Sequence, residues 1–419
     1  MRRFIPKKLL SLYHLWFALL GAKFYGNPSH ALFVIGITGT KGKSTTSELV
    51  RTMLAGAGYK VALASTIHFR IGDEIEPNLF KMTMPGRAYL QQFMRRALDA
   101  KCTHVIIEMT SEGAKQFRHR GIELDALLFT NLQPEHLESH GSLEAYAQAK
   151  LSLAHGLAES PKRPRIIVAN MDDVYGEEFL KTNVEVKVPF QLADADPYTV
   201  DDTGVRFVYK KGELCTIPLP GLFNLRNILG TIALGVAMGI DMQTIKKSLE
   251  HVQPILGRAE RVEAGQDFAV VVDYAHTPDS LKALFETYKS KRIIVVMGST
   301  GGGRDTWKRP EMGKIADQLC DTIILANEDP YDEDPQKILN ELARGFTIHT
   351  PQIIFHRRKA IAEALSSAHT LRDEGYDVVV LITGKGTDPY IMGPNGSKEV
   401  WSDKQVATEE LHKLRDSHK

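Results

Sequence analysis

A short glycine-containing loop between an apolar strand and a helix limits the fold of this chain more than any other feature. Residues 34–46 read VIGITGTKGKSTT, so a strand runs into the loop and GKST opens the helix. Gly39 and Gly42 let backbone N–H groups close around a phosphate, and the helix N-terminus favours the anion. Lys43 can reach the β- and γ-phosphates, and Ser44 can ligand Mg²⁺. This pattern predicts an α/β domain that binds a nucleoside triphosphate.

The loop departs from the usual phosphate-binding spacing at one position, because Ile37 stands where a glycine is common. Strand, turn, lysine and hydroxyl nevertheless follow one another in the expected order, so the prediction of nucleotide binding holds. The loop residues expected to contact the triphosphate are Gly39, Thr40, Gly42, Lys43, Ser44 and Thr45.

Composition narrows the class of protein. A chain of 419 residues is long enough for two or three domains. Its formal net charge of +1 creates no overall field that would attract nucleic acid, so no nucleic-acid partner is expected. The cysteines, Cys102, Cys215 and Cys320, are isolated in the sequence. We therefore expect a reducing, cytoplasmic compartment, without a disulfide framework or a zinc site.

Apolar runs alternate with amphipathic helical patterns from residue 33 onward. This alternation predicts an α/β fold: a P-loop central domain with a mostly parallel sheet at residues 33–253 and a doubly wound, Rossmann-like domain at residues 254–419. Because ligands bind at the carboxyl ends of parallel strands, we expect the active site in a cleft between the domains, with a hinge near Pro254. The strands expected first are residues 32–37, 61–65, 104–108, 126–130 and 165–169.

Residues 1–32 form a separate basic and apolar segment. Arg2, Arg3, Lys7 and Lys8 precede an apolar run at residues 9–20. The run is shorter than the ~20 residues of a membrane-spanning helix. Two interpretations stay open: a helix docked on the central domain, or an interfacial helix that makes peripheral contact with the inner membrane face through residues 1–25.

Eight motifs in the chain, the phosphate-binding loop among them, follow one another in a familiar order. They read GITGTKGKSTT, IEMTSEG, FTNLQPEHLESHGSLEAYAQAK, LPGLFNLRN, GRAERV, VVDYAHTPDSL, GGGRDTWKRPEMG and ITGKGTDPY. Over about residues 33–403 the chain resembles the Mur ligase family. The closest branch is the UDP-N-acetylmuramoyl-tripeptide synthetases, which add the third amino acid of the peptidoglycan stem peptide.

The resemblance implies a reaction and its cofactors. A carboxylate of the muramoyl-L-Ala-D-Glu acceptor takes the γ-phosphoryl group of ATP, and the amine of an amino acid then displaces phosphate to form an amide. By resemblance, Ser44 and Glu108 hold one Mg²⁺ and His136 helps to hold a second. Lys150 matches the lysine that the family carbamylates, which turns a cation into an oxygen ligand. The catalytic residues implied are Lys43, Glu108, His136 and Lys150.

The resemblance also implies contacts with ATP and with the acceptor. Asn224 and Asn227 match positions near the adenine, Arg258 matches an arginine that reaches the triphosphate, and Asp273 matches a carboxylate on the ribose side. Glu112 stands where the family commonly has histidine. The residues that match acceptor contacts are Thr83, Pro85, Ser111, Gln116 and Arg118.

The pocket for the incoming amino acid departs from the diaminopimelate branch, which carries Asp-Asn-Pro-Arg and grips a distal carboxylate with the arginine. This chain has EDPY at residues 328–331, so Tyr331 replaces that arginine. A carboxylate at Glu328 or Asp329 would instead suit a distal ammonium, as in lysine or ornithine. Arg304 could clamp the α-carboxylate, and Arg304 or Arg357 could also supply the missing charge. Asp388 stands where a glutamate usually follows Gly-Lys-Gly.

Other functions remain open at this point. Members of this branch normally carry an N-terminal uridine-binding domain, and about thirty residues precede the first strand here. The acceptor could therefore be lipid-linked, or free of UDP. A folylpolyglutamate synthetase-like ligase is a second enzyme hypothesis, and a nucleotide-binding scaffold without turnover is a third.

Overall fold

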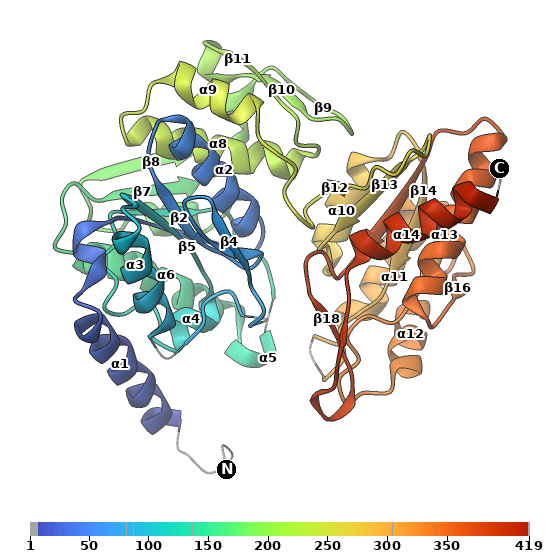
Figure 1. The fold of residues 1–419 in the computed structure, drawn as a ribbon, viewed down its shortest axis with the longest axis horizontal. Coiled ribbons are helices and arrows are strands. Elements are labelled where there is room, and N and C mark those ends of the chain that lie inside the picture. The colour runs from blue at the N-terminus through green and yellow to red at the C-terminus, as the bar shows by residue number, and fades with distance from the viewer. Residues whose placement is uncertain (1–6, 81, 87, 136, 304, 418–419) are drawn as a thin grey trace. The chain divides into compact units, whose positions relative to one another are not determined.

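The computed structural model describes residues 7–80, 82–86, 88–135, 137–303 and 305–417. The chain forms two compact units, each with its own α/β core (Figure 1). Unit 1 comprises residues 1–199, 205–218 and 223–252, and unit 2 comprises residues 200–204, 219–222 and 253–419.

Unit 1 is built on an eight-stranded sheet in the order β4-β3-β2-β5-β1-β6-β7-β8. Neighbouring strands are parallel except at the β2-β3-β4 edge, where the pairing is antiparallel. The strands are β1 (Phe33–Thr38), β2 (Val61–Ala64), β3 (His68–Ile71), β4 (Glu74–Pro77), β5 (His104–Met109), β6 (Ala126–Phe129), β7 (Ile166–Asn170) and β8 (Val186–Phe190). The phosphate-binding loop leaves the sheet at the carboxyl end of its central strand, β1.

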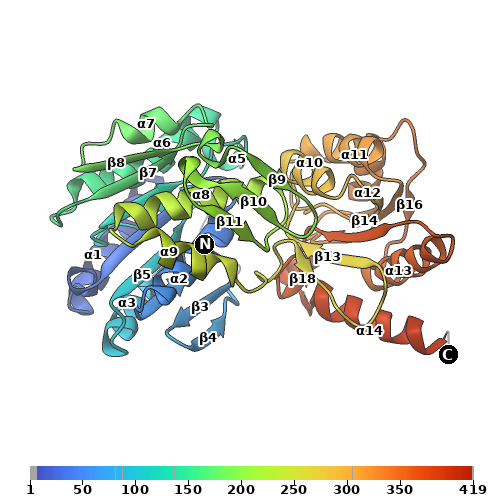
Figure 2. The same cartoon turned by 90° about the horizontal axis from the view of Figure 1, so that it is seen from above.

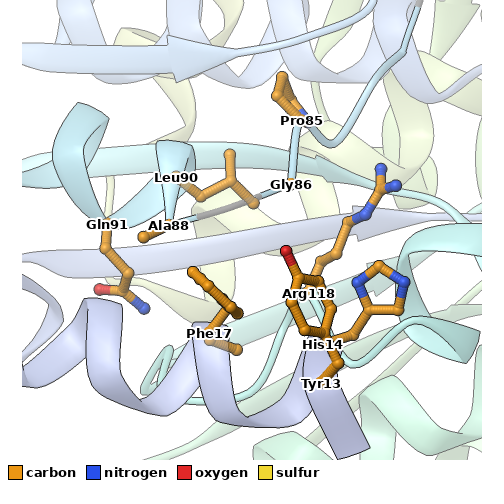
Figure 3. Close-up of a pocket in the computed structure, with 10 residues that line it drawn as sticks. Tyr13, His14, Phe17, Pro85, Gly86, Ala88, Leu90, Gln91 and Arg118 are labelled. Atoms are coloured by element: carbon orange, nitrogen blue, oxygen red, sulfur yellow. The ribbon is translucent and has the colours of Figure 1, made fainter. Parts of the chain in front are cut away.

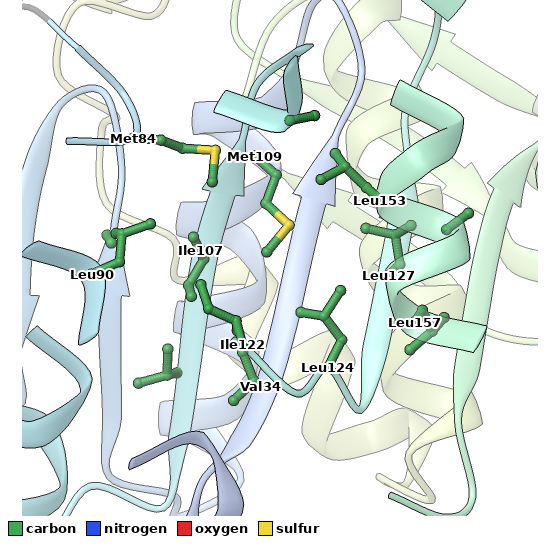
Figure 4. Close-up of a cluster of buried hydrophobic side chains, with 14 of the residues drawn as sticks. Val34, Met84, Leu90, Ile107, Met109, Ile122, Leu124, Leu127, Leu153 and Leu157 are labelled. Atoms are coloured by element: carbon green, nitrogen blue, oxygen red, sulfur yellow. The ribbon is translucent and has the colours of Figure 1, made fainter. Parts of the chain in front are cut away.

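Helices cover both faces of this sheet. One face packs against α3 and α6, and Figure 4 shows Leu90, Leu153 and Leu157 from these helices against Ile107 and Leu127 from the strands. On the other face, α2 contacts β1, β2 and β5, and also packs against α9. The helices are α1 (Lys7–Phe24), α2 (Lys43–Gly56), α3 (Tyr89–Asp99), α4 (Ser111–Lys115), α5 (Leu137–His140), α6 (Leu143–Glu159), α7 (Gly176–Leu180), α8 (Leu222–Ala237) and α9 (Met242–Glu250).

A small antiparallel sheet, in the order β11-β10-β9, follows the main sheet in the chain. Its strands are β9 (Tyr198–Val200), β10 (Val205–Val208) and β11 (Leu214–Ile217). Four short 3₁₀ helices complete the described structure: η2 (Pro28–Ala31), η3 (Leu192–Ala195), η4 (Tyr209–Lys211) and η5 (Pro394–Gly396).

Unit 2 contains a six-stranded sheet in the order β12-β13-β17-β14-β15-β16, parallel except for β12 (Figure 2). The strands, including a separate β18-β19 hairpin, are β12 (Glu260–Arg261), β13 (Ala269–Asp273), β14 (Arg292–Met297), β15 (Thr322–Leu325), β16 (Gln352–Ile353), β17 (Val378–Thr383), β18 (Tyr390–Met392) and β19 (Lys398–Val400). The helices are α10 (Pro278–Thr287), α11 (Lys308–Leu319), α12 (Pro335–Ala343), α13 (Arg357–Asp373) and α14 (Asp403–Ser417). Buried side chains fill both sides of this sheet.

The first helix, α1, is docked on unit 1. Ala18 and Ala22 are buried, and Gly21 lies so close to Ala88 that a Cβ on the glycine would be 2.3 Å from the alanine Cβ. The docked-helix interpretation of the N-terminal segment is therefore confirmed for the described part of the segment. None of the described helices is long and apolar enough to cross a membrane.

The predicted fold class is confirmed, with a mostly parallel sheet in each unit. The five strands expected first are present within one residue of their predicted limits. The sequence interpretation missed β3, β4 and β8. The first two are four residues long, and β4 is fully exposed, so neither produces a sustained apolar pattern.

We expect Ile35→Ala to destabilise unit 1 strongly. Ile35 lies in the central strand β1 and is completely buried, so its truncation removes apolar contacts and leaves a cavity. The expected loss is about 2–5 kcal/mol of unfolding free energy, measured by urea unfolding. The control Val174→Ala, at an exposed position, should change stability by less than about 0.5 kcal/mol. Equal effects of the two substitutions would contradict this placement of the core.

Candidate active site

The phosphate-binding loop is held in a conformation that only glycine fits at two points. Gly39 has φ +146° and Gly42 has φ +81°, both in the region that L side chains rarely adopt. A Cβ on Gly39 would lie 2.0 Å from Thr130 Oγ1, and a Cβ on Gly42 would lie 2.2 Å from Asn227 Oδ1. The loop backbone is therefore packed closely on its neighbours, as a cradle for phosphate requires.

The segment after β6 fixes the path of this loop. Thr40 N donates to Asn131 O (2.8 Å), and Lys41 N donates to Asn131 Oδ1 (2.9 Å). Thr130 Oγ1 donates to Lys41 O at 2.7 Å. Backbone groups on one side of the loop are thus satisfied within the protein. Neither Thr130 nor Asn131 was among the predicted site residues, although both lie in the motif at residues 129–150.

Two oxygen donors meet where a hard cation would sit beside the loop. Ser44 is the second residue of α2, and its Oγ donates a hydrogen bond to Glu108 Oε2 at 3.0 Å. Glu108 lies near the carboxyl end of β5, the neighbour of β1 in the sheet. Hydroxyl and carboxylate oxygens are the ligands that Mg²⁺ prefers, with water and phosphate oxygens completing the shell. These residues fit a Mg²⁺ site.

Glu108 has a further partner that the sequence analysis missed. Thr66 N donates to Glu108 Oε2 (2.8 Å), and Thr66 Oγ1 donates to Glu108 Oε1 (3.0 Å). Thr66 Oγ1 also lies 2.7 Å from Thr83 Oγ1. Thr83, expected on the acceptor side, is therefore one hydroxyl away from the carboxylate. Thr66 could have been predicted from its position just beyond the carboxyl end of β2, because ligands bind at the carboxyl ends of parallel strands.

Lys150 reaches the same loop from α6. Its side chain is 1% exposed, and Nζ donates to Gly39 O at 2.6 Å. The ammonium also lies 4.8 Å from the centre of the Tyr146 ring, and the Tyr146 hydroxyl is 3.0 Å from Thr40 Oγ1. Burial, followed by the positive charge of Lys43, holds the pKa of Lys150 well below its ordinary value. A buried lysine with this pKa has a larger neutral fraction than a surface lysine.

The loop carries two further lysines. Lys43 Nζ donates to Thr40 O at 2.9 Å, so its side chain folds over the loop it belongs to. Lys41 Nζ pairs with Glu135 Oε1 at 2.8 Å. Neither Lys41 nor Glu135 was among the predicted site residues, although both occur in the quoted motifs. The structure thus brings Lys41, Lys43 and Lys150 around one short loop.

The asparagines of α8 lie beside the loop as well. Asn227 is the neighbour that a side chain at Gly42 would strike, and its Nδ2 donates to Asn224 Oδ1 at 3.3 Å. Both side chains are buried. The two predicted adenine-side residues therefore form a pair on α8, and Asn227 of this pair lies beside Gly42 at the start of α2.

The predicted acceptor residues cluster around α4. Ser111 opens α4, and Thr110 caps this helix by accepting a hydrogen bond from Gly113 N. Arg118 donates to Met84 O and to Gln116 Oε1. Gln116 in turn donates to Glu112, the residue that stands in place of the family's histidine. Pro85 directly follows Met84, so the expected acceptor contacts form one connected group.

Unit 2 holds the remaining predicted nucleotide residues. Asp273 ends β13, and its two carboxylate oxygens accept hydrogen bonds from Ala259 N (2.6 Å) and Ala275 N (2.7 Å). Arg258 lies 4.6 Å from the centre of the Tyr274 ring. Asp273 thus fixes the backbone next to Arg258.

The predicted amino-acid pocket in unit 2 contains a lysine that the sequence analysis did not use. Lys385 Nζ donates to Asp329 Oδ1 (2.8 Å) and lies 3.4 Å from Asp388 Oδ2. Asp329 Oδ1 also accepts from Met392 N at 2.8 Å. The negative charge of Asp329 is therefore balanced within the protein.

Two other charged residues of this region are buried. Glu328 accepts a hydrogen bond from Thr300 Oγ1, and its Oε2 has no hydrogen-bond partner within the described residues. Burial raises the pKa of Glu328. Arg357 is paired with Asp403 at 2.7 Å and also donates to Thr383 O. Arg357 thus already holds a carboxylate inside unit 2, while its Nη1 has no hydrogen-bond partner within the described residues. Its role as a substitute anchor stays a prediction.

Two predicted residues, His136 and Arg304, lie outside the described residues. Their proposed roles, a second Mg²⁺ site and a clamp for the amino-acid carboxylate, stay predictions.

The fold and the loop define a class of protein: a P-loop enzyme with a separate Rossmann-like unit. Residues 37–235 match the Mur ligase middle domain, and residues 257–386 match the Mur ligase, glutamate ligase domain. The UDP-N-acetylmuramoyl-L-alanyl-D-glutamate–2,6-diaminopimelate ligase of Geobacillus kaustophilus is 33% identical over 417 residues, which cover 96% of this chain and 83% of the relative. The enzyme of that name from Bacillus velezensis is 36% identical over 386 residues, covering 89% and 77%. The chain belongs to the Mur ligase family, whose members use ATP and Mg²⁺.

Solved structures agree with this assignment. A structure of a UDP-N-acetylmuramoyl-L-alanyl-D-glutamate–2,6-diaminopimelate ligase has a TM-score of 0.62 at 27% identity, covering 92% of this chain and 79% of that one. The folylpolyglutamate synthase of Mycobacterium tuberculosis has a TM-score of 0.73 at 14% identity, covering 96% and 95%. At that identity the second similarity shows a shared fold.

We expect Gly42→Ala to weaken ATP binding at least about tenfold, because the new methyl group would meet Asn227 and displace the loop. Isothermal titration calorimetry measures this effect. Gly58→Ala is a matched control: Gly58 also has a positive φ, of +86°, but a Cβ there meets nothing within 4 Å. The control should lose about 1 kcal/mol of stability and keep its affinity for ATP. Unchanged ATP affinity in Gly42→Ala would contradict the proposed cradle.

Proposed function

We propose that this protein is an ATP-dependent amide ligase of peptidoglycan precursor synthesis, which joins a third amino acid to a muramoyl-L-Ala-D-Glu acceptor. The observation that carries the proposal is the convergence of Ser44, Glu108 and Lys150 on one phosphate-binding loop. A protein that only bound nucleotide would not require a buried lysine opposite a metal-type carboxylate. The relatives named above support the choice of acceptor.

ATP would supply the phosphoryl group that converts the acceptor carboxylate into an acyl phosphate, and bound Mg²⁺ would offset the charge on the phosphate oxygens. The protein's own part is positioning and electrostatics. Lys43 would leave Thr40 O and point at the β- and γ-phosphates, which are stronger acceptors than a carbonyl. Ser44 and Glu108 would turn their oxygens toward the cation rather than toward each other.

Lys150 carries the most specific chemical proposal. Its low pKa leaves the amine with a lone pair, which attacks the carbon of CO₂ to form an N–C bond. One C–O π pair moves onto oxygen, and the nitrogen releases a proton to water. The product is a carbamate anion on a side chain that was cationic or neutral. The positive charges of Lys43 and Lys41 favour this negative charge, whereas the negative charges of Glu135 and Glu108 oppose it. A cation held by Glu108 would add to the favourable side.

We expect ¹³C-labelled bicarbonate to give a carbamate signal in the ¹³C NMR spectrum of the wild-type protein. Lys150→Arg should lack the signal and lose at least about a hundredfold in kcat, since guanidinium does not form a carbamate. Lys115→Arg, on the exposed side of α4, is the control and should keep both the signal and the activity. Full activity of Lys150→Arg would contradict the proposed role.

The amino-acid substrate follows from the charges of unit 2. Glu328, Asp329 and Asp388 bring three carboxylates together with one ammonium, that of Lys385. Tyr331 stands where the diaminopimelate branch has arginine, so no cation at that position would attract a distal carboxylate. We therefore propose lysine or ornithine, whose side chains end in an ammonium group. Because Lys385 balances Asp329, the proposal depends chiefly on Glu328 and Asp388.

The test is ATP-dependent phosphate release with UDP-N-acetylmuramoyl-L-Ala-D-Glu and, separately, lysine, ornithine and diaminopimelate. We expect turnover with a diamino acid that lacks the second carboxylate. Tyr331→Arg should raise kcat/KM for diaminopimelate relative to lysine by about tenfold or more, because it restores the anchoring cation. Tyr331 already has φ +54°, so arginine meets the same backbone strain as tyrosine.

Tyr331→Phe is the control for the loss of the hydroxyl and should leave the preference between the two amino acids unchanged. Efficient use of diaminopimelate by the wild-type protein would overturn the proposed specificity while leaving the ligase reaction intact. Turnover with a folate and glutamate, and none with the muramoyl peptide, would instead support the folylpolyglutamate synthetase-like alternative.

A further inference from the structure

The N-terminal segment has a charge distribution unlike the rest of the chain. Residues 1–32 contain the five basic residues Arg2, Arg3, Lys7, Lys8 and Lys23, and the first acidic residue of the whole sequence is Glu48. The chain as a whole has 52 basic and 51 acidic side chains. The net charge of the whole chain is therefore close to zero, although residues 1–32 are strongly cationic.

Helix α1, within this segment, has two apolar faces. The inner face is made of small residues: Ala18, Gly21 and Ala22 pack on unit 1, where a Cβ on Gly121 would lie 2.9 Å from Ala22 Cβ. This face accounts for the docking of the helix. On the other side of α1, several large apolar side chains are exposed.

The outer face is large, aromatic and exposed. Its residues follow the spacing of three or four positions that places side chains on one side of a helix. Trp16 is 62% exposed and Phe24 is 82% exposed. The exposed members are Tyr13, Trp16, Phe17, Leu20 and Phe24. We call these five residues the outer stripe of α1.

The outer stripe adjoins residues expected to contact the acceptor. Tyr13, His14 and Phe17 line a pocket whose opposite wall contains Pro85 and Arg118 (Figure 3). A surface that binds the outer stripe would therefore lie next to the entrance of this pocket.

We propose that the outer stripe of α1, together with the basic residues that the sequence has in segment 1–32, docks this protein on an anionic lipid bilayer. Aromatic side chains, tryptophan and tyrosine above all, partition into the interface between lipid headgroups and acyl chains. Lysine and arginine near the same surface are attracted to anionic headgroups. The exposed aromatic residues of the outer stripe and the basic residues of segment 1–32 meet these two requirements.

Charge decides between a bilayer and a second copy of this chain. Self-association through the outer stripe would bring two segments, each with five basic residues and no acidic one, against each other. Like charges in contact oppose that arrangement. An anionic bilayer has the complementary charge and covers the apolar stripe as well.

The test is co-sedimentation of the full chain with vesicles of phosphatidylcholine containing about 30% phosphatidylglycerol. Neither ATP, acceptor nor amino acid is added, so the result is independent of the proposed ligase function. We expect binding to these vesicles, weakening as salt is raised, and at least about tenfold weaker binding to phosphatidylcholine alone. The fluorescence of Trp16, obtained by subtracting the spectrum of Trp16→Phe from that of the wild type, should shift to the blue on binding.

Two variants separate the apolar and the charged contributions. Replacing Trp16, Leu20 and Phe24 by serine should reduce vesicle binding at least about tenfold, and changing Arg2, Arg3, Lys7 and Lys8 to glutamine should have an effect of similar size. The control carries Val174→Ser and Ile348→Ser, which are equally exposed apolar positions elsewhere in the chain, and should bind as wild type. All variants should keep the wild-type melting temperature, because the substituted apolar side chains are exposed.

Three outcomes would overturn the proposal. One is a wild-type protein that does not bind the anionic vesicles. Another is equal binding by wild type and the serine variant. A third is a concentration-dependent dimer that the serine variant disperses, with no vesicle binding, which would identify the outer stripe as a self-association face.

Discussion

The close packing of the phosphate-binding loop against its neighbours is the constraint on which the rest of the site depends. Gly39 lies against Thr130, and Gly42 lies against Asn227. Hydrogen bonds from Thr40 and Lys41 to Asn131 fix the backbone between them. The loop is therefore shaped by β6 and α8 before any ligand arrives, and binding does not have to order it. That preorganisation is what lets a short loop concentrate charge.

The same geometry links the lysines of the site electrostatically. A loop tight enough to hold a triphosphate brings Lys43 close to Lys150, and this proximity lowers the pKa of Lys150 in addition to its burial. The positive charge that serves phosphate binding thus favours the neutral form of the neighbouring amine. Conversely, a negative charge on Lys150 would lower the repulsion among the three lysines. Nucleotide binding and the proposed carbamylation of Lys150 would therefore influence each other electrostatically.

Sequence alone predicted the parts of this structure that depend on local pattern. The strand before Gly39 and the helix after Gly42 follow from periodicity and loop chemistry, and Lys150 was found through a resemblance. Thr66 was missed because its contact with Glu108 joins residues 42 positions apart, and only the sheet brings them together. Lys385 was missed for the same reason, since its partner Asp329 lies 56 positions away. Patterns reveal elements, whereas pairings between distant side chains depend on how those elements pack.

The pairing of Lys385 with Asp329 changes how the charge of a ligand pocket should be inferred. Reading residues 328–331 as a motif assigns a full negative charge to Asp329, but the lysine and Met392 N already occupy one of its oxygens. The field at the pocket is the sum over Glu328, Asp388 and Lys385 as well. Burial raises the pKa of Glu328 and thereby weakens its contribution at low pH. The proposed discrimination between amino acids would therefore depend on these four side chains together, and a substitution at one of them changes the field of the whole group.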